Sequence, residues 1–316
     1  MNEFDFIRRY LNQAQKDSEL ILSIGDDAAI LRPNPAYDLH ISADMLVENR
    51  HFFAGVDPAD LAHKALAVNL SDMAAMGAKP RWVVLSVALP ELNADWLQAF
   101  CDQLFALANE HGVQLIGGDT TKGPLTLNVT IIGQTPKGQS LRRSHAKAGD
   151  DVWVSGQLGL AACALHHHFG NEALPDEVFT LFERARNRPT ARVALGRALL
   201  PYAHAAQDVS DGLAQDLQHI LSASGVGARI NADAVPTHDY IRGLSKHYAY
   251  ALAGGDDYEL LFTAPTACRV ALLEISKQVN VPITQVGTIT AEKGLQLVNQ
   301  QGEPILLNQY GFDHFS

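Results

Sequence analysis

The spacing of apolar residues in the first half of the chain predicts helices that alternate with strands. The clearest helix lies within residues 57–80, where Asp57 can cap the first turn and Gly77 can end the last one. Pro80 then prevents the helix from continuing. The same reasoning predicts a second helix at residues 93–112, and strands at residues 39–44, 81–90, 113–117 and 125–135.

The second half of the chain repeats this alternation after a polar segment near residues 136–150. A polar segment between two sets of elements is typical of a domain boundary. The sequence therefore predicts a mixed α/β (α+β) protein with one domain over residues 1–140 and another over residues 141–316. In the second domain, helices are predicted at residues 159–169, 190–200 and 212–224, and strands at residues 205–211, 250–264 and 283–290.

The composition indicates an acidic globular protein of 316 residues, with 47% hydrophobic residues and a formal net charge of -11. Such a chain lacks the basic surface that nucleic acids need. No apolar run approaches the roughly 20 residues that span a bilayer, and the first residues lack the apolar core of a signal peptide. Cys101, Cys163 and Cys268 form no disulfide or metal pattern. We therefore expect a cytoplasmic protein with neither a nucleic acid nor a membrane as partner.

Acidic residues recur beside glycine or serine where the predicted strands and helices end. Small neighbours let a ligand approach the backbone, and magnesium is held mainly by carboxylates together with substrate phosphates. Taken singly, each motif is more typical of a turn, in which aspartate bonds its own backbone. Together they favour a site where several metal ions hold a polyphosphate, provided that they meet in space. The six motifs lie at residues 25–27, 42–44, 71–73, 117–120, 208–212 and 254–259.

Asp72 differs from the other acidic residues because it lies on an apolar face of a predicted helix. It follows Lys64 by two helical turns, so the two side chains share that face. Two interpretations remain open for Asp72: a metal ligand, or a partly buried carboxylate that pairs with Lys64.

Other features of the sequence narrow the choice of fold and site. The chain contains neither the G-x-x-x-x-G-K-[ST] loop nor the G-x-G-x-x-G motif, so any use of ATP does not depend on the common nucleotide-binding folds. The consecutive histidines 166–168 point in different directions on a helix and are predicted to be a surface helix end. The arginine-rich residues 184–197 are predicted to be a solvated loop and helix start, although they could also attract phosphate.

Taken in order along the chain, eight segments resemble the thiamine-monophosphate kinase family, within the aminoimidazole-ribonucleotide-synthetase-like superfamily of ATP-dependent enzymes. The segments are GDDAA (25–29), SADMLVENRHF (42–52), KALAVNLSDMAAMGAKP (64–80), GGDTTKG (117–123), RRSHAKAGDDVWVSG (142–156), DVSDGL (208–213), GGDDYELLF (254–262) and GFDHF (311–315).

The resemblance implies a two-domain, synthetase-like fold. The N-terminal domain would pair its strands with those of a second copy in a homodimer, and the C-terminal α/β domain would complete a cleft for ATP. The terminal phosphoryl group of ATP would pass directly to thiamine monophosphate, with several Mg²⁺ ions and no phospho-enzyme. Neither a covalent nucleophile nor a general base is expected, because the acceptor phosphate oxygen is already nucleophilic.

The resemblance also implies roles for individual residues. The implied metal ligands are Asp27, Ser42, Ala43 through its backbone, Asp44, Asp72, Asp119, Asp208 and, for a further ion, Asp211. The implied nucleotide contacts are Gly118, Asp119, Arg143 and Ser210. The implied contacts to thiamine phosphate are His51, Glu259 and Phe312.

Three positions depart from the usual pattern of this family. Ala43 replaces a threonine of many relatives, and Phe312 replaces a tryptophan, although phenylalanine can still stack on a cationic ring. The sequence Gly-Gly-Asp-Asp replaces Gly-Gly-Glu-Asp, so the role of Asp256 is open.

Other functions also remain open at this point. One alternative is another ATP-dependent synthetase of the same superfamily, such as a selenophosphate synthetase or a purine-pathway synthetase. A selenophosphate synthetase would usually carry a reactive cysteine or selenocysteine near its N-terminus, whereas the first cysteine here is Cys101 in a predicted helix. A non-catalytic nucleotide-binding scaffold would bind ATP without forming a product. A metal-dependent phosphatase would release phosphate without needing ATP.

Overall fold

The computed structural model describes residues 7–11 and 17–312, and it separates into two compact units. The first unit contains the chain up to Met73 together with Ala78–Gln139. The second contains Ala74–Gly77 together with the chain from Ser140 onward. Each unit has its own sheet and helices, which confirms the predicted mixed α/β class. In the described part of the chain, no helix is both long and apolar enough to span a membrane.

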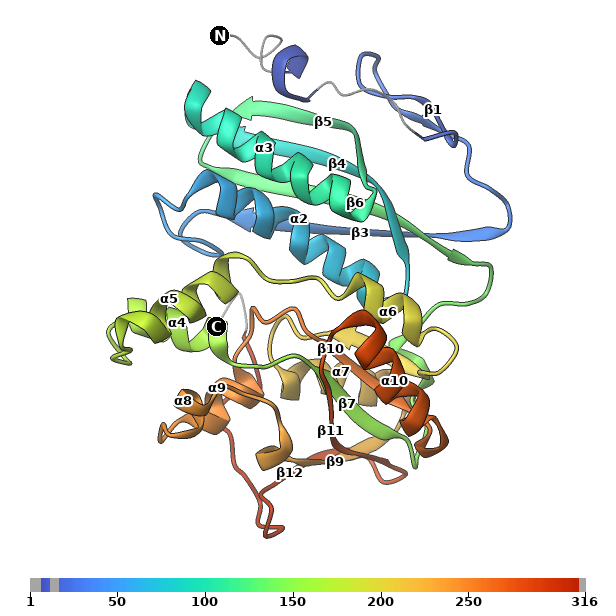
Figure 1. The fold of residues 1–316 in the computed structure, drawn as a ribbon, viewed down its shortest axis with the longest axis vertical. Helices are drawn as coiled ribbons and strands as arrows, with labels where there is room; N and C mark the ends of the chain where they lie inside the picture. Colours follow the sequence, from blue (N-terminus) through green and yellow to red (C-terminus); the bar gives the residue numbers. More distant parts are fainter. Residues whose placement is uncertain (1–6, 12–16, 313–316) are drawn as a thin grey trace. The chain divides into compact units, whose positions relative to one another are not determined.

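The first unit is built on a four-stranded sheet, and its elements are η1 (Ile7–Leu11), β1 (Leu20–Leu22), β2 (Ile30–Leu31), β3 (Tyr37–Val47), α2 (Pro58–Ala75), β4 (Lys79–Leu89), α3 (Ala94–His111), β5 (Gln114–Lys122) and β6 (Thr126–Pro136). The strand order is β3-β6-β4-β5, with β6 antiparallel to both neighbours and β5 parallel to β4. α2 and α3 lie on one face of the sheet (Figure 1). β1 and β2 form a separate two-stranded arm.

The predicted ends of α2 and α3 are confirmed. Asp57 Oδ1 accepts hydrogen bonds from the N–H groups of Ala59 at 2.8 Å and Asp60 at 3.3 Å. Gly77 adopts a left-handed backbone with φ 68°, which glycine reaches at little cost. Asn93 caps α3 in the way that Asp57 caps α2. Both helices therefore begin and end where the sequence places their signals.

The prediction that the strand before α2 ends at Asp44 is wrong. β3 pairs with β6 without interruption as far as Val47, because its alternation of inward and outward residues continues past Asp44. β5 also extends beyond its predicted end. A Cβ atom at Gly118 would lie 1.8 Å from the Leu85 carbonyl oxygen, so the missing side chain allows β5 to stay paired with β4.

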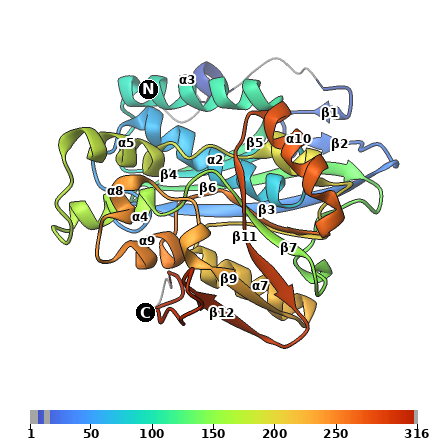
Figure 2. The ribbon, with the colours of Figure 1, turned by 60° about the horizontal axis from the view of Figure 1, so that its bottom comes forward.

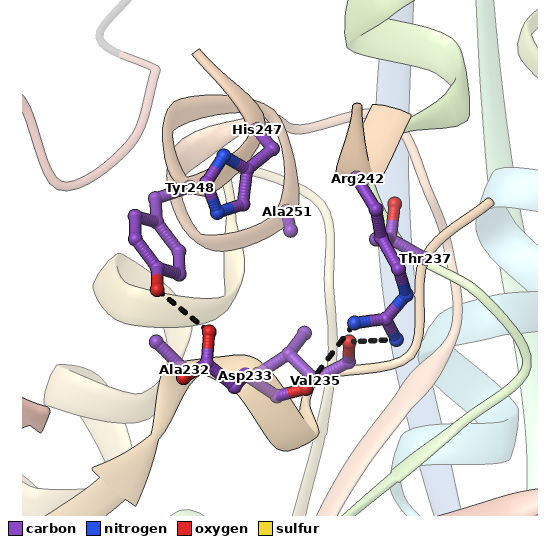
Figure 3. Close-up of a pocket in the computed structure, with 8 residues that line it drawn as sticks. All are labelled: Ala232, Asp233, Val235, Thr237, Arg242, His247, Tyr248 and Ala251. Carbon is purple, nitrogen blue, oxygen red and sulfur yellow. Dashed lines mark hydrogen bonds between the residues drawn. The ribbon is translucent and has the colours of Figure 1, made fainter. Parts of the chain in front are cut away.

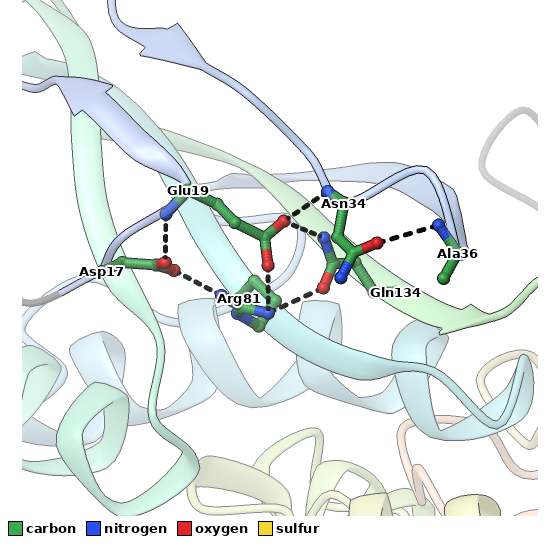
Figure 4. Close-up of polar contacts among 6 residues, drawn as sticks. All are labelled: Asp17, Glu19, Asn34, Ala36, Arg81 and Gln134. Atoms are coloured by element: carbon green, nitrogen blue, oxygen red, sulfur yellow. Dashed lines mark hydrogen bonds and ion pairs between the residues drawn. The ribbon is translucent and has the colours of Figure 1, made fainter.

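Arg81 holds the base of the two-stranded arm against the sheet. Its guanidinium donates to Asp17 at 2.7 Å, to Gln134 at 2.7 Å and to Glu19 at 3.3 Å (Figure 4). The Glu19 carboxylate also accepts hydrogen bonds from the Gln134 side chain at 2.8 Å and from the Asn34 N–H at 3.0 Å. Residues on both sides of the arm are thus bonded to one carboxylate, which fixes the ends of the segment that carries the first acidic motif.

The second unit is built on a six-stranded sheet of order β12-β9-β11-β7-β10-β8, in which only the β12–β9 pair is parallel. α7 and α10 lie on opposite faces of this sheet (Figures 1 and 2). The elements are η2 (Arg143–His145), β7 (Asp151–Ser155), α4 (Leu160–His168), α5 (Asp176–Asn187), α6 (Val193–Leu199), β8 (Ala205–Asp208), α7 (Leu213–Ser224), β9 (Gly227–Asn231), η3 (Ala232–Ala234), α8 (Asp239–Arg242), α9 (His247–Ala253), β10 (Leu260–Ala264), η4 (Thr266–Cys268), α10 (Arg269–Val279), β11 (Ile283–Thr290) and β12 (Gly294–Val298).

The strand predicted over residues 250–264 is wrong in its first half. The residues up to Ala253 belong to the helix α9, and the strand β10 begins at Leu260. Between them, Asp256 with φ 70° and Tyr258 with φ 52° adopt the left-handed backbone, which interrupts a strand. The apolar run before this loop is therefore the buried face of a helix, which a short run cannot reveal from its period.

The prediction that residues 184–197 are a solvated segment is wrong for two of its arginines. Arg186 is 4% exposed and donates two hydrogen bonds to Glu183, at 2.8 and 2.6 Å. Arg192 donates to both oxygens of Glu259, at 2.7 and 2.5 Å. Each guanidinium enters the protein because a carboxylate is placed to receive it.

Candidate functional site

In the first unit, β3 and α2 bring three predicted site residues together. Ser42 Oγ donates a hydrogen bond to Asp72 Oδ2 at 2.5 Å. Asp44 lies on the same side of β3, and burial together with the Asp72 carboxylate raises the pKa of Asp44 to about 7. Ala43 lies on the opposite face of β3, so its side chain points away from the two carboxylates. The result is a set of hard oxygen donors with excess negative charge, which suits Mg²⁺.

The raised pKa of Asp44 predicts how metal-free protein responds to pH. Folding raises this pKa from 3.8 to about 7, so the folded state keeps a proton that the unfolded state releases. Stability should therefore fall as the pH rises from about 4 to about 7. Thermal unfolding at a series of pH values should show this fall, and Asp44→Asn should reduce it. Equal pH slopes in the two proteins would contradict the assignment.

The other predicted site residues of the first unit do not belong to this group of Ser42, Asp44 and Asp72. They are exposed or lie in turns. Asp27 is exposed in the arm, and Asp119 is exposed in β5 next to Gly118. His51 lies in the turn after β3, where its Nδ1 accepts a hydrogen bond from the Val47 N–H at 3.0 Å. The structure brings the serine and the two half-buried acids together, while the convergence of Asp27 and Asp119 with them stays a prediction.

In the second unit, the loop between β8 and α7 carries three predicted site residues, Asp208, Ser210 and Asp211. Asp208 is buried at the end of β8. Asp216 of α7 accepts hydrogen bonds from the N–H groups of Ser210 at 3.0 Å, Asp211 at 3.1 Å and Gly212 at 3.1 Å. Burial and the Asp211 charge raise the pKa of Asp216 to about 7, although the three amides oppose this. Sequence analysis missed Asp216. Its signal is an acid four residues after a glycine N-cap.

The loop before β10 is bonded to the loop before α7. The N–H of Asp256 donates to the Ser210 carbonyl oxygen at 2.8 Å. The next residue, Asp257, accepts the Gly159 N–H with both oxygens at 3.0 Å, at the start of α4. Burial raises the pKa of Asp257 well above its usual range. The sequence analysis included Asp257 in the 254–259 motif but gave it no role, because a cap that is remote in sequence leaves no local pattern.

Glu259, predicted to contact the substrate, has a buried carboxylate that already bonds to protein groups. Arg192 donates to both of its oxygens, and Ser155 Oγ donates to one of them at 2.5 Å. A Cβ atom at Gly156 would lie 1.9 Å from Glu259 Oε1, so glycine makes room for the acid. The structure thus gives Glu259 a definite role in the protein interior, and its contact with substrate stays a prediction.

The last described residues dock onto the loop before α7. The Phe312 N–H donates to the Asp211 carbonyl oxygen at 3.0 Å, and the Gln215 side chain donates to the Phe312 carbonyl oxygen at 3.0 Å. The Phe312 ring is half exposed, whereas the last residues of the GFDHF motif, 313–315, lie outside the described part. Phe312 is therefore held beside Asp211, with ring surface left for a ligand.

Arg143, the predicted phosphate contact, is exposed in the short helix η2. Its carbonyl oxygen accepts a hydrogen bond from Ser224 Oγ at 2.7 Å, and Ser224 Oγ accepts one from the Ala146 N–H at 3.0 Å. The backbone of η2 is thus fixed to the end of α7, while the role of the guanidinium stays a prediction.

Two further groups in the second unit are held by internal contacts. His168 pairs with Glu183 at 3.1 Å and is the last residue of α4, which agrees with a helix end for the histidine tract.

A recess of about 150 Å³ contains Asp233, Arg242 and Tyr248 (Figure 3). Tyr248 donates to Asp233 at 2.6 Å, and Arg242 donates to two backbone carbonyl oxygens at 3.2 Å. None of the predicted site residues lines this recess.

Comparison with known proteins extends over almost the whole chain. Residues 25–135 match the N-terminal domain of AIR synthase related proteins, and residues 147–299 match the C-terminal domain. The thiamine-monophosphate kinase of Salmonella typhimurium is 45% identical over 99% of this chain and 98% of that protein. The crystal structure of thiamine-monophosphate kinase from Stenotrophomonas maltophilia K279a has a TM-score of 0.84 and 45% identity, covering 91% of this chain and 93% of that one. AaThiL complexed with AMPPCP and TMP has a TM-score of 0.77 and 28% identity, covering 93% and 92%.

Proposed function

We infer that this chain, which belongs to the thiamine-monophosphate kinase family, transfers the terminal phosphoryl group of ATP to thiamine monophosphate, giving thiamine diphosphate and ADP. It is a kinase whose acceptor is itself a phosphate group. The observation that carries this inference is the similarity to such kinases over nearly the full length, together with the acidic pair on β3 and α2. The complex of a relative with AMPPCP, an analogue of ATP, supports ATP as the phosphoryl donor.

We propose Mg²⁺ as the metal because the residues present suit it. Ser42, Asp44 and Asp72 offer oxygen donors. The pKa of Asp44 is raised first by burial and then by the Asp72 charge, and a bound cation would offset both effects. Asp208 and Asp211 offer carboxylates in the second unit, and Asp27 and Asp119 are accessible in the first. When bound, Mg²⁺ neutralises charge on the phosphate groups of the two substrates.

The other proposed residues would position the substrates or bind their charged groups. Arg143 would donate to a phosphate, for which a guanidinium has the matching geometry. Phe312 would stack on the thiazolium or pyrimidine ring of the substrate, since its half-exposed ring is anchored beside Asp211. Phosphoryl transfer of this kind needs no covalent intermediate on the protein, because the acceptor oxygen is already nucleophilic.

The decisive test is incubation with ATP, Mg²⁺ and thiamine monophosphate, followed by chromatography. Thiamine diphosphate and ADP should appear in equal amounts. Release of phosphate from thiamine monophosphate without ATP would indicate a phosphatase instead. Binding of ATP without any product would indicate a nucleotide-binding scaffold.

The absence of a membrane-spanning helix among the described residues agrees with a cytoplasmic location, which we also propose.

The exposed face of β3 supports a homodimer. β3 is an edge strand, and Tyr37, Leu39, Ile41 and Met45 on its outward face are 42%, 40%, 69% and 55% exposed. An apolar stripe on an open edge strand is suited to pairing with another strand. We propose that a second copy of the chain covers it.

The substitution Ile41→Glu should disrupt this dimer, because it places a charge in the centre of the stripe. Size-exclusion chromatography with light scattering should show a dimer for the unmodified protein and a monomer for the variant. Val270→Glu changes an equally apolar residue, 70% exposed on α10, and should leave the mass unchanged. A dimer in both variants would exclude β3 as the interface.

A further inference from the structure

Asp216 gathers four hydrogen-bond donors on one buried carboxylate. The residue is 1% exposed. One oxygen, Oδ2, accepts the N–H groups of Ser210, Asp211 and Gly212 at 3.0, 3.1 and 3.1 Å. The other oxygen, Oδ1, accepts the side-chain amide of Gln207 at 2.7 Å. The loop before α7 is therefore wrapped around a single side chain that lies one turn inside the helix.

In the described structure, the N-cap position of α7 makes no side-chain hydrogen bond. The N-cap residue is Gly212, which offers no capping oxygen, although the first N–H groups of a helix need acceptors. A larger residue at Gly212 does not fit, since a Cβ atom there would lie 2.9 Å from the Ala253 carbonyl carbon. Asp216 instead accepts the N–H groups of the N-cap residue Gly212 and of the two residues before it, so it fixes the loop that leads into α7.

We propose that Asp216 is a positioning residue for phosphoryl transfer. By fixing the backbone of residues 210–212, it sets the direction in which Ser210 and Asp211 present their side chains to the nucleotide and metal. The proposal rests on the function proposed above for these two residues. Asp216 itself does not contact substrate.

The main alternative is that Asp216 is a metal ligand. Asp211, Asp216 and His219 offer ligand atoms that lie within 4.8 Å of one another. Both oxygens of Asp216 are already used by backbone and side-chain donors, however. Oδ2 is occupied by three amides, so a metal could approach only Oδ1, beside the Gln207 amide and in a residue that is 1% exposed. The geometry therefore favours an acceptor of hydrogen bonds over a ligand.

The two roles differ in what they require of the side chain. A positioning role requires one oxygen toward the three amides, which asparagine supplies. The asparagine NH2 group would then face Gln207, whose Oε1 is buried and has no hydrogen-bond partner in the described structure. Rotation of the Gln207 amide would present this oxygen to the new donor. Asp216→Asn should therefore keep the loop in place, whereas Asp216→Ala removes every acceptor.

The test compares Asp216→Ala, Asp216→Asn and His219→Ala with the unmodified protein. Three quantities are measured: kcat and KM with ATP and thiamine monophosphate, calorimetric binding of Mg²⁺–AMPPCP, and deuterium exchange of the 207–216 peptide. Asp216→Ala should lower kcat about 10- to 100-fold and speed exchange in this peptide, as loss of a supporting hydrogen-bond partner does. Asp216→Asn should stay within about fivefold of the unmodified kcat. His219→Ala should resemble the unmodified protein.

Each outcome bears on the proposal. Equal loss of activity in the Asn and Ala variants, with slow exchange in the Asn variant, would show that the charge is required and would overturn it. Unchanged kcat and exchange in Asp216→Ala would also overturn it. Slow exchange in the Asn variant and fast exchange in the Ala variant support it even if the unmodified protein forms no thiamine diphosphate, a result that would instead reject the proposed function.

Discussion

Replacement of Asp72 by asparagine should lower kcat about a thousandfold while the protein remains folded. The substitution keeps the size of the side chain and its ability to accept the Ser42 hydrogen bond, but it removes one of two neighbouring negative charges. A bound cation requires that negative charge. Without the cation, the phosphate groups of the two substrates repel each other. Steady-state kinetics with saturating ATP, Mg²⁺ and thiamine monophosphate measures the loss.

A matched control distinguishes this effect from a general loss of negative charge. Asp102 lies on α3 in the same unit, is exposed, and accepts a hydrogen bond from Gln98 at 2.8 Å. Asp102→Asn should change neither kcat nor thermal stability appreciably. A kcat in Asp72→Asn close to that of the control would remove Asp72 from the metal site, and loss of the folded signal would assign it a structural role.

Replacement of Arg192 by methionine should have the largest effect on stability. The side chains of Arg192 and Glu259 are 19% and 8% exposed, and two hydrogen bonds join them. Burial lowers the pKa of Arg192, but the Glu259 carboxylate more than compensates and raises it overall. Removal of one partner leaves a buried charge uncompensated, which costs about 3 kcal/mol at partly exposed sites of this kind. Thermal unfolding should then shift downward by about 10 °C.

Two further variants test whether the unpaired buried charge causes this loss of stability. Arg197 is an exposed arginine on α6, the helix that begins directly after Arg192, and Arg197→Met should change the stability by less than about 0.5 kcal/mol. Replacing both partners, Arg192→Met with Glu259→Met, should be less harmful than Arg192→Met alone, because no unpaired charge remains. If the double variant were the least stable, packing around the pair and not the buried charge would explain the loss.

Local signals in the sequence were reliable where one segment contains the whole cause. Asp57 and Gly77 bound α2 as predicted because a cap and a left-handed glycine act on their own helix. The alternation of β6 and the apolar strand β4 were predicted for the same reason. The strand end predicted at Asp44 was wrong because the pairing of β3 with β6, which extends the strand to Val47, involves residues about 80 positions or more away.

The same distinction between local and long-range causes applies to the site residues. Ser42, Asp44 and Asp72 were predicted as ligands from their motifs, and the structure brings them together across β3 and α2. Asp216 was missed, and Asp257 was part of the 254–259 motif but was given no role, although both hold the loops around the predicted residues. Asp257 accepts the Gly159 N–H from 98 positions away, so no local pattern indicates its role. The amides around Asp216 are only four to six positions away, and its local signal, an acid four residues after a glycine N-cap, was overlooked.

The sequence by itself determined the helix ends, most strands, the mixed α/β class and the order of motifs that identifies the family. These properties depend on contacts between residues a few positions apart, or on residue types that the chemistry of phosphate and metal requires. The tertiary structure alone decided that Arg192 pairs with Glu259 and that Asp257 accepts the Gly159 N–H at the start of α4. Burial and remote hydrogen bonds arise only when segments far apart in the chain pack together, so a linear pattern contains no trace of them.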